Sequence, residues 1–315
     1  MLRPLPSSET ENVPTAHRPL PIATNREAPS GRLAAVTCHF NPCGYRRLRE
    51  NFFRFREALR GCPLFTMEVS FDGQFHLPAD WQVRATEKNV MWQKESLINE
   101  MVKRLPDRFD QVAWIDADLL FLNPDWAAET SGILREVPVA QLYENWLHTS
   151  ANWNVAQRSE PSLLRKRREG LQGHGQPGGA WSARRELIEA HGVFPWNIVG
   201  GGDTNFSDAL FGQFNGPITQ ISSSGLNQLF LAWGQRFYLD VGGRVGCTSG
   251  DIVHLFHGTI QNRRYIERAA ILREAQFDPR EDVRIGPDGL LEWASHKPEL
   301  HRRLRDYFLA RREDE

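Results

Sequence analysis

The sequence predicts an α/β fold in which a mixed, mostly parallel sheet is flanked by helices. Short apolar runs alternate with amphipathic stretches of helical spacing, which is the βαβ rhythm of a doubly wound sheet. The chain has 315 residues, of which 40 % are hydrophobic, so it can bury the core of one large domain. Two aspartates follow one of the expected strands directly, and open α/β sheets bind ligands at such strand ends.

The first half of the chain carries the clearest elements. Leu33–Thr37 is a short apolar run that predicts a buried strand. A helix is expected from Tyr45, because apolar residues recur at helical spacing up to Leu59, and Gly61 follows where a glycine commonly ends a helix. The next strand, helix and strand are expected at Leu64–Val69, Gln93–Leu105 and Gln111–Ile115.

The second half is expected to be less regular. After the apolar run Val137–Tyr143, a polar, aromatic and basic segment over residues 146–175 predicts a long loop or insertion on the acceptor side of the site. This segment contains the basic run Arg165–Arg168. Ile252–Gly258 is expected to be a last buried strand that ends in histidines, and Pro298–Arg312 a basic amphipathic helix.

The ends and the bulk composition restrict the location of the protein. Residues 1–31 contain six prolines among polar residues and no signal-peptide core, which predicts a disordered, Pro-rich leader. The sequence lacks any run of about eighteen apolar residues, so no membrane span is expected. Four scattered cysteines without a Cys-x-x-Cys pair indicate neither a disulfide framework nor a zinc knuckle. We therefore expect a cytoplasmic protein.

The balance of charge gives little support for a polyanionic partner. The formal net charge is −1, so no long-range field of one sign draws the protein to nucleic acid or to an anionic membrane.

Asp116 and Asp118 are the strongest candidates for chemistry. They alternate with Ala117 at a strand end, so both carboxylates can converge on one hard cation, Mn²⁺ or Mg²⁺. Such a cation neutralises the diphosphate of a nucleotide sugar and stabilises the leaving group. A solvated Asp-x-Asp pair is the alternative. The apolar flanks Val112–Ile115 and Leu119–Leu122 favour the metal, because burying two unpaired acids is costly.

His254 and His257 stand at the end of the last expected strand. A neutral imidazole is a suitable third ligand for manganese, so at least one of them is predicted to bind the metal. A core histidine bonded to a backbone carbonyl is the alternative. Arg263 and Arg264 follow, and guanidinium groups match the geometry of phosphate oxygens; a solvated helix start is equally compatible with them.

Two glycine-rich segments permit a ligand to approach the backbone closely. Asp203 follows three glycines and is predicted either to accept the proton of an attacking hydroxyl or to hold the acceptor. A glycine-rich turn at a helix start is the competing interpretation. Trp181 follows another glycine pair, and its indole can pack on a sugar ring or in the core.

Taken together and in order, these motifs resemble those of the GT-A fold glycosyltransferases, with a galactosyltransferase-like C-terminal region. The matching segments are Trp92–Glu95, Asp116–Asp118, Gly178–Trp181, Gly200–Asp203 and His254–Gly258.

The resemblance implies a Rossmann-like GT-A domain over residues 32–275, with a nucleotide-binding half at 32–145 and an acceptor and metal half at 146–275. A C-terminal helical extension would follow at 276–315. It also implies that Asp203 serves the acceptor as catalytic base. Here Asp203 is followed by Thr204, where galactosyltransferases usually have consecutive acids, so it stays open whether Asp203 alone is the base and whether the reaction retains or inverts configuration.

The sequence thus predicts a metal-dependent hexosyltransferase that moves a sugar from a nucleotide sugar, UDP-linked, to a hydroxyl of a glycan, small molecule, protein or modified DNA base. A nucleotidyltransferase or another metal-dependent phosphate-ester enzyme is the first alternative. A non-catalytic carbohydrate- or nucleic-acid-binding module is the second, and ten tryptophans would suit it. The predicted metal ligands are Asp116, Asp118, His254 and His257. The predicted donor contacts are Thr37, Lys94, Asp116, Gly178, Gly179, Trp181 and Arg263. The predicted acceptor contacts are Gly201, Gly202 and Asp203.

Overall fold

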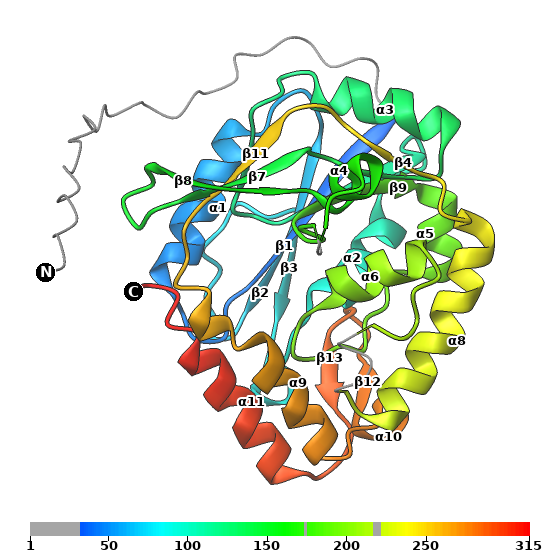
Figure 1. Cartoon of the computed structure of the whole chain (residues 1–315). Helices are drawn as coiled ribbons and strands as arrows, with labels where there is room; N and C mark the ends of the chain where they lie inside the picture. Colours follow the sequence, from blue (N-terminus) through cyan, green and yellow to red (C-terminus); the bar gives the residue numbers. More distant parts are fainter. Residues whose placement is uncertain (1–31, 173–174, 217–221) are drawn as a thin grey trace, which may run out of the picture.

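The computed structural model describes residues 32–172, 175–216 and 222–315, and the predicted leader, residues 1–31, lies outside them. The described chain has the expected mixed α/β architecture, with a central sheet between helices (Figure 1). This sheet has the strand order β10-β6-β9-β4-β1-β2-β3. All its strands are parallel except β9, which runs antiparallel to both β4 and β6. The prediction of a mostly parallel sheet is therefore confirmed.

The central sheet and its helices contain the predicted elements in their predicted order, together with several strands and helices that were not predicted. The strands are β1 (Leu33–Phe40), β2 (Leu64–Ser70), β3 (Trp81–Arg84), β4 (Gln111–Ile115), β6 (Val139–Gln141), β9 (Ala180–Arg184) and β10 (Val245–Cys247). The helices are α1 (Arg46–Ala58), α2 (Lys94–Arg104), α3 (Trp126–Glu136), α5 (Arg185–His191), α6 (Gly202–Leu210), α8 (Ser224–Val241) and α9 (Tyr265–Glu274).

Strand β1 shows how the sheet separates two hydrophobic cores. Ala34 and Val36 point to the core that contains residues of α2, α5, α6 and α8, whereas Leu33 and Ala35 point to the core of α1 and α3. This alternation follows from the period of two along a strand. Because both faces are covered, the first four residues of the strand are all apolar, and each fully buried valine or leucine contributes about 1.5–3 kcal/mol. The polar residues Thr37 and His39 follow toward its carboxyl end.

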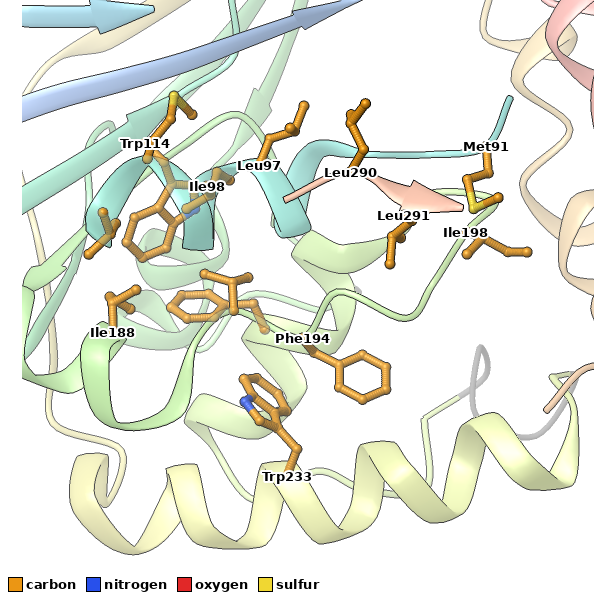
Figure 2. Close-up of a cluster of buried hydrophobic side chains, with 14 of the residues drawn as sticks. Met91, Leu97, Ile98, Trp114, Ile188, Phe194, Ile198, Trp233, Leu290 and Leu291 are labelled. Atoms are coloured by element: carbon orange, nitrogen blue, oxygen red, sulfur yellow. The ribbon is translucent and has the colours of Figure 1, made fainter. Parts of the chain in front are cut away.

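The larger core extends well beyond the sheet. Figure 2 shows Trp114 of β4 close to Leu97 and Ile98 of α2, with Ile188 of α5 and Trp233 of α8 farther from the sheet. These side chains fix α2 against the strands, and the first turn of α2 carries functional candidates.

A second sheet covers one end of the first and determines the geometry of the site. Its strand order is β5-β11-β7-β8, and its strands are β5 (Leu119–Phe121), β7 (Asn145–Thr149), β8 (Val155–Pro161) and β11 (Asp251–His254). The predicted last strand is therefore real, but it belongs to this sheet and ends at His254.

Residues 146–175 correct the prediction of a long loop or insertion. They contain most of β7, all of β8 and helix α4 (Leu163–Glu169), whose cap is the Ser162 hydroxyl accepting from the Arg165 backbone N–H. The sequences of β7 and β8 are rich in polar residues, so the segment lacks the continuous apolar run by which a buried strand is predicted. The expectation of a long loop is therefore wrong for the described part of this segment.

The C-terminal segment contributes to the main core. Besides helices α10 (Pro279–Asp282) and α11 (Pro298–Ala310), it contains the hairpin of β12 (Val283–Ile285) and β13 (Leu291–Trp293). Leu291, Leu300 and Leu304 are buried in the same core as α2 and α8. Among the described residues, no helix is both long and apolar enough to cross a membrane.

Candidate metal centre and the cavity beside it

One carboxylate and two imidazoles converge at the end of β11. Asp118 Oδ2 lies 2.9 Å from His257 Nε2 and 3.6 Å from His254 Nε2. The two Nε2 atoms are 3.1 Å apart. Each of the three residues thus presents one possible ligand atom to the same point in space.

The register of the second sheet brings these residues together. Leu119 of β5 pairs with His254 of β11, and the Leu255 backbone N–H donates to the carbonyl of Asp118 at 2.8 Å. Strand pairing and this hydrogen bond therefore hold Asp118, the residue before β5, beside the histidines, although more than a hundred residues separate them in the sequence.

The residues present fit a divalent cation. Ligand bonds of about 2.0–2.2 Å place neighbouring ligand atoms roughly 3.0–3.5 Å apart in octahedral or tetrahedral geometry, and the three observed separations are close to this range. Asp118 Oδ1 is buried without a hydrogen-bond partner among the described residues, an unfavourable state for a carboxylate oxygen that a cation relieves. One oxygen and two imidazole nitrogens suit Mn²⁺ and related ions.

The electrostatics favour the ligand protonation state at two of the three groups. Burial lowers the pKa of His254 to about 4, which leaves its imidazole neutral. Burial works to raise the pKa of Asp118, but His254 and His257 outweigh it and hold this pKa well below its usual range. Asp118 is therefore an ionised carboxylate, as a metal ligand must be. Burial and Arg263 work to lower the pKa of His257, but Asp118 outweighs them and raises this pKa above its usual value, so a cation competes with a proton for this ring.

Asp116 lies on the other side of the strand end, in contact with Lys94. Lys94 Nζ is 2.8 Å from Asp116 Oδ1 and 2.9 Å from Asp203 Oδ2. Burial, opposed by Lys94, raises the pKa of Asp116 to about 6. Of the two predicted metal-binding aspartates, the structure brings only Asp118 to the histidines. It instead joins Asp116 and Asp203 through Lys94, a connection that the sequence did not predict.

Glycines stand next to the acidic groups of the site. A Cβ on Gly178 would lie 3.4 Å from Asp203 Oδ2, and the carbonyl of Gly179 accepts from the Asp116 N–H at 2.8 Å. Gly201, with φ of 98°, is the residue before helix α6, and Asp203 lies in the first turn of this helix. The interpretation of this segment as a glycine-rich helix start is therefore confirmed, and it leaves the Asp203 carboxylate free to have a functional role as well.

Glu95 is an acid that sequence reasoning passed over, although it stands in the matching segment Trp92–Glu95. It is 2 % exposed, and a Cβ on Gly202 would lie only 2.0 Å from its Oε1. Burial raises the pKa of Glu95 to about 8. The helix start of α6 thus rests on a carboxyl group that is protonated at neutral pH.

Two predicted donor contacts have other partners in the structure. Trp181 is fully buried, its ring lies against Phe206 and its N–H donates to the Pro177 carbonyl at 2.7 Å. The prediction that its face packs on a sugar is therefore wrong for this conformation, because the indole fills the core. The Thr37 hydroxyl lines the cavity but donates to the carbonyl of Ile115 at 2.8 Å.

A cavity of about 160 Å³ adjoins the candidate metal centre. The cavity lies where β1 and β4 end. From β1 the strand order continues to β2 and β3 on one side of the sheet, whereas β4 lies on the other side of β1, so the order reverses between β1 and β4. Such a reversal of strand order is the usual ligand position in an open α/β sheet. Its lining combines the loop Asn41–Cys43 with Lys94, Asp116, Asp118 and both histidines.

Arginine and glutamate side chains complete the wall next to His257. Arg263 Nη2 is 2.8 Å from His257 Nε2, and its Nε is buried without a hydrogen-bond partner in the described part of the chain. Arg311 and Glu313 also line the cavity. Nothing in the charged C-terminal sequence distinguishes these two from solvated residues, so only the fold could identify them.

Comparison with known proteins yields structural likenesses alone. No family model and no curated protein matches the sequence. The structure is similar to glucosyl-3-phosphoglycerate synthase from Mycobacterium tuberculosis in complex with Mn²⁺, UDP and phosphoglyceric acid, at 12 % identity and a TM-score of 0.39 over 76 % of this chain and 75 % of that one. It is also similar to the catalytic domain of Drosophila β1,4-galactosyltransferase 7 in complex with xylobiose, at 16 % identity and a TM-score of 0.32 over 68 % and 63 % of the two chains. Likenesses at this level decide neither family nor activity, which must be inferred from the site.

Proposed function

We propose that the protein is a metal-dependent glycosyltransferase that moves a sugar from a nucleotide sugar, UDP-linked, to a hydroxyl group of an acceptor. The observation that carries the proposal is the convergence of Asp118, His254 and His257 on one point in the wall of a cavity at the strand-order reversal.

Asp118, His254 and His257 would hold the cation directly. When bound, Mn²⁺ or Mg²⁺ neutralises a diphosphate and stabilises the charge that develops on the leaving group. Asp116 is proposed to act at longer range through water, because its carboxylate is engaged by Lys94.

Arg263 is the proposed phosphate contact of the donor. No carboxylate of the described residues lies within ion-pair distance of this guanidinium, and its buried Nε–H has no acceptor there. A guanidinium fork that lacks an acid partner matches diphosphate oxygens. Thr37 and Lys94 line the same cavity and remain proposed donor contacts, whereas Gly178 and Gly179 are proposed to act through the close backbone approach that they permit.

Asp203 is the proposed base for the acceptor hydroxyl. Lys94 holds its carboxylate at 2.9 and 3.1 Å, and its place in the first turn of α6 favours the negative charge. Glu95 is unsuited to this role, because its raised pKa of about 8 keeps it protonated at neutral pH. Positioned general-base catalysis contributes about 10²- to 10⁴-fold, so loss of Asp203 should lower kcat without abolishing donor binding.

A donor panel tests the proposal. The protein is mixed with UDP-, GDP-, CMP- and dTDP-sugars, with and without Mn²⁺, and thermal unfolding is followed, since a bound donor stabilises the fold by mass action. The stabilising donor is then incubated with Mn²⁺, and the products are separated. We expect release of nucleoside diphosphate that EDTA prevents. Release of pyrophosphate would indicate nucleotidyl transfer instead, and EDTA-insensitive sugar binding without turnover would indicate a binding module.

A further inference from the structure

We propose that Glu313 is a positioning residue of the metal centre, where its carboxylate orients His257 as a ligand. The C-terminal tail, residues 311–315, is then part of the site. This inference depends on the proposed metal site, but it concerns residues to which no role has been given above.

The position of Glu313 relative to the His257 ring supports the inference. Glu313 is 3 % exposed, and its Oε1 lies 3.7 Å from His257 Nδ1. The opposite ring nitrogen, Nε2, faces Asp118 at 2.9 Å. Nδ1 is buried and has no hydrogen-bond partner among the described residues. Histidines that bind metals usually donate their other N–H to a carboxylate or carbonyl, which fixes both tautomer and ring orientation.

The Glu313 carboxylate is itself held in place. Arg311 forms an ion pair with it and also donates to the Tyr307 hydroxyl at 3.0 Å, while its guanidinium lies over the ring of Trp92. Burial works to raise the pKa of Glu313, but Arg311 and His257 outweigh it and hold this pKa at about 2. His257 therefore faces an ionised carboxylate of restricted orientation.

Gly258 permits the tail to run directly against the histidine segment. Its φ is +81°, and a Cβ there would lie 3.1 Å from the carbonyl oxygens of Arg311 and Arg312 and 3.2 Å from Glu313 Cα. The glycine after His257 thus has a physical reason, because a side chain would push the tail away from the imidazole.

Asp314 fixes the tail to the start of helix α1. Its carboxylate accepts from the backbone N–H groups of Arg46 at 3.1 Å and Arg47 at 2.7 Å. These are the first N–H groups of α1, which has no side-chain cap of its own. The Tyr45 hydroxyl accepts from the Arg312 N–H at 3.2 Å. In Figure 1 the red C-terminal end accordingly lies next to the blue helix α1.

Mn²⁺ affinity of the full chain tests the inference. Free Mn²⁺ is measured by electron paramagnetic resonance in titrations of the wild type, of R311M and of the double variant R311M/E313Q. Both variants break the Arg311–Glu313 pair. Compared with R311M, the double variant differs only in lacking the Glu313 carboxylate, the partner of His257. The net charge of residues 311 and 313 is then zero, as in the wild type. We expect R311M to bind Mn²⁺ at least as tightly as the wild type, and the double variant to bind it about 10- to 100-fold more weakly. E315Q is the matched control, because among the described residues the Glu315 carboxylate pairs with Arg312 alone, at the surface, and this variant should bind Mn²⁺ like the wild type.

The outcomes test the role of Glu313 and the existence of the metal centre separately. Wild-type affinity in the double variant overturns the role of Glu313 and leaves the metal centre standing. No Mn²⁺ binding by the wild type overturns the proposed centre and this inference with it. The unfolding temperature of each metal-free variant shows whether it folds. If the double variant does not fold, E313D, which keeps the carboxylate, must bind Mn²⁺ more tightly than E313Q, and equal affinities refute the inference.

Discussion

Gly202→Ala is the substitution whose effect can be worked out most directly from the structure. The added Cβ would lie 2.0, 2.3 and 2.7 Å from Oε1, Cδ and Cγ of Glu95. These distances are far inside van der Waals contact, and Glu95 is 2 % exposed, so it has little room to withdraw. Overpacking of this kind costs about 1–3 kcal/mol. For a domain of this size the unfolding temperature should fall by roughly 2–10 °C.

The same clash should also lower activity. Relief requires helix α6 or Glu95 to move, and the first turn of α6 carries Asp203, which Lys94 holds at 2.9 Å. Misplacement of a reacting group by about 1 Å can cost roughly 10²-fold in rate. We therefore expect kcat of sugar transfer, or of donor hydrolysis, to fall about 10- to 100-fold.

Two further variants isolate the cause. Gly132→Ala, in the middle of α3, adds a Cβ whose nearest neighbour is at 3.6 Å, so this matched control should raise the unfolding temperature by about 1–3 °C through helix propensity. Adding Glu95→Ala to Gly202→Ala removes the clashing atoms, and the double variant should be less destabilised than the sum of the single changes. Differential scanning fluorimetry measures these three variants and Glu95→Ala alone. Strict additivity, or a Gly202→Ala protein as stable as the wild type, would refute the reasoning.

Three other outcomes are expected. Asp118→Asn should abolish saturable Mn²⁺ binding in isothermal titration calorimetry, whereas Asp125→Asn, the same change at an exposed site, should leave it intact; retained affinity in the first variant contradicts the proposed centre. Arg263→Met should raise the KM for the nucleotide sugar about 10-fold or more while changing the unfolding temperature by under about 2 °C, and an unchanged KM in steady-state kinetics removes this residue from the donor site. Burial raises the pKa of Asp208 to about 7 from its ordinary 3.8. The wild type therefore loses stability as the pH rises from about 4 to about 7, because the unfolded chain gives up this proton first. The free energy of unfolding of Asp208→Asn should exceed that of the wild type by about 1–3 kcal/mol at pH 8 and by little at pH 4. Urea unfolding at both pH values checks this, and an equal gain at both would contradict it.

The sequence alone determined the strands that are covered on both faces and the amphipathic helices that pack on the sheet. Strands β1, β2 and β4 and helices α1 and α2 agree with the predicted ranges to within a few residues. Their patterns are local, because a covered strand is continuously apolar and a helix between sheet and solvent repeats its apolar residues with helical period. The hairpin of β7 and β8 and the strand β3 have no such run, so they could be identified only from their pairing with neighbouring strands in the structure.

The candidate site divides in the same way. Sequence reasoning could select Asp118, His254 and His257, because each polar residue interrupts or ends an apolar segment, and burial of such groups needs a reason. It could not separate Asp118 from Asp116, since the register between β5 and β11 decides which carboxylate meets the histidines.

The tertiary structure alone placed Trp181 in the core and Glu313 beside His257. Both outcomes depend on which distant segments are packed together, and no local pattern contains that information. The sequence thus determined which residues are chemically suited to a metal site at the strand ends. Strand register and the packing of the C-terminal tail decided which of them share one centre, because contacts between residues far apart in the chain exist only after folding.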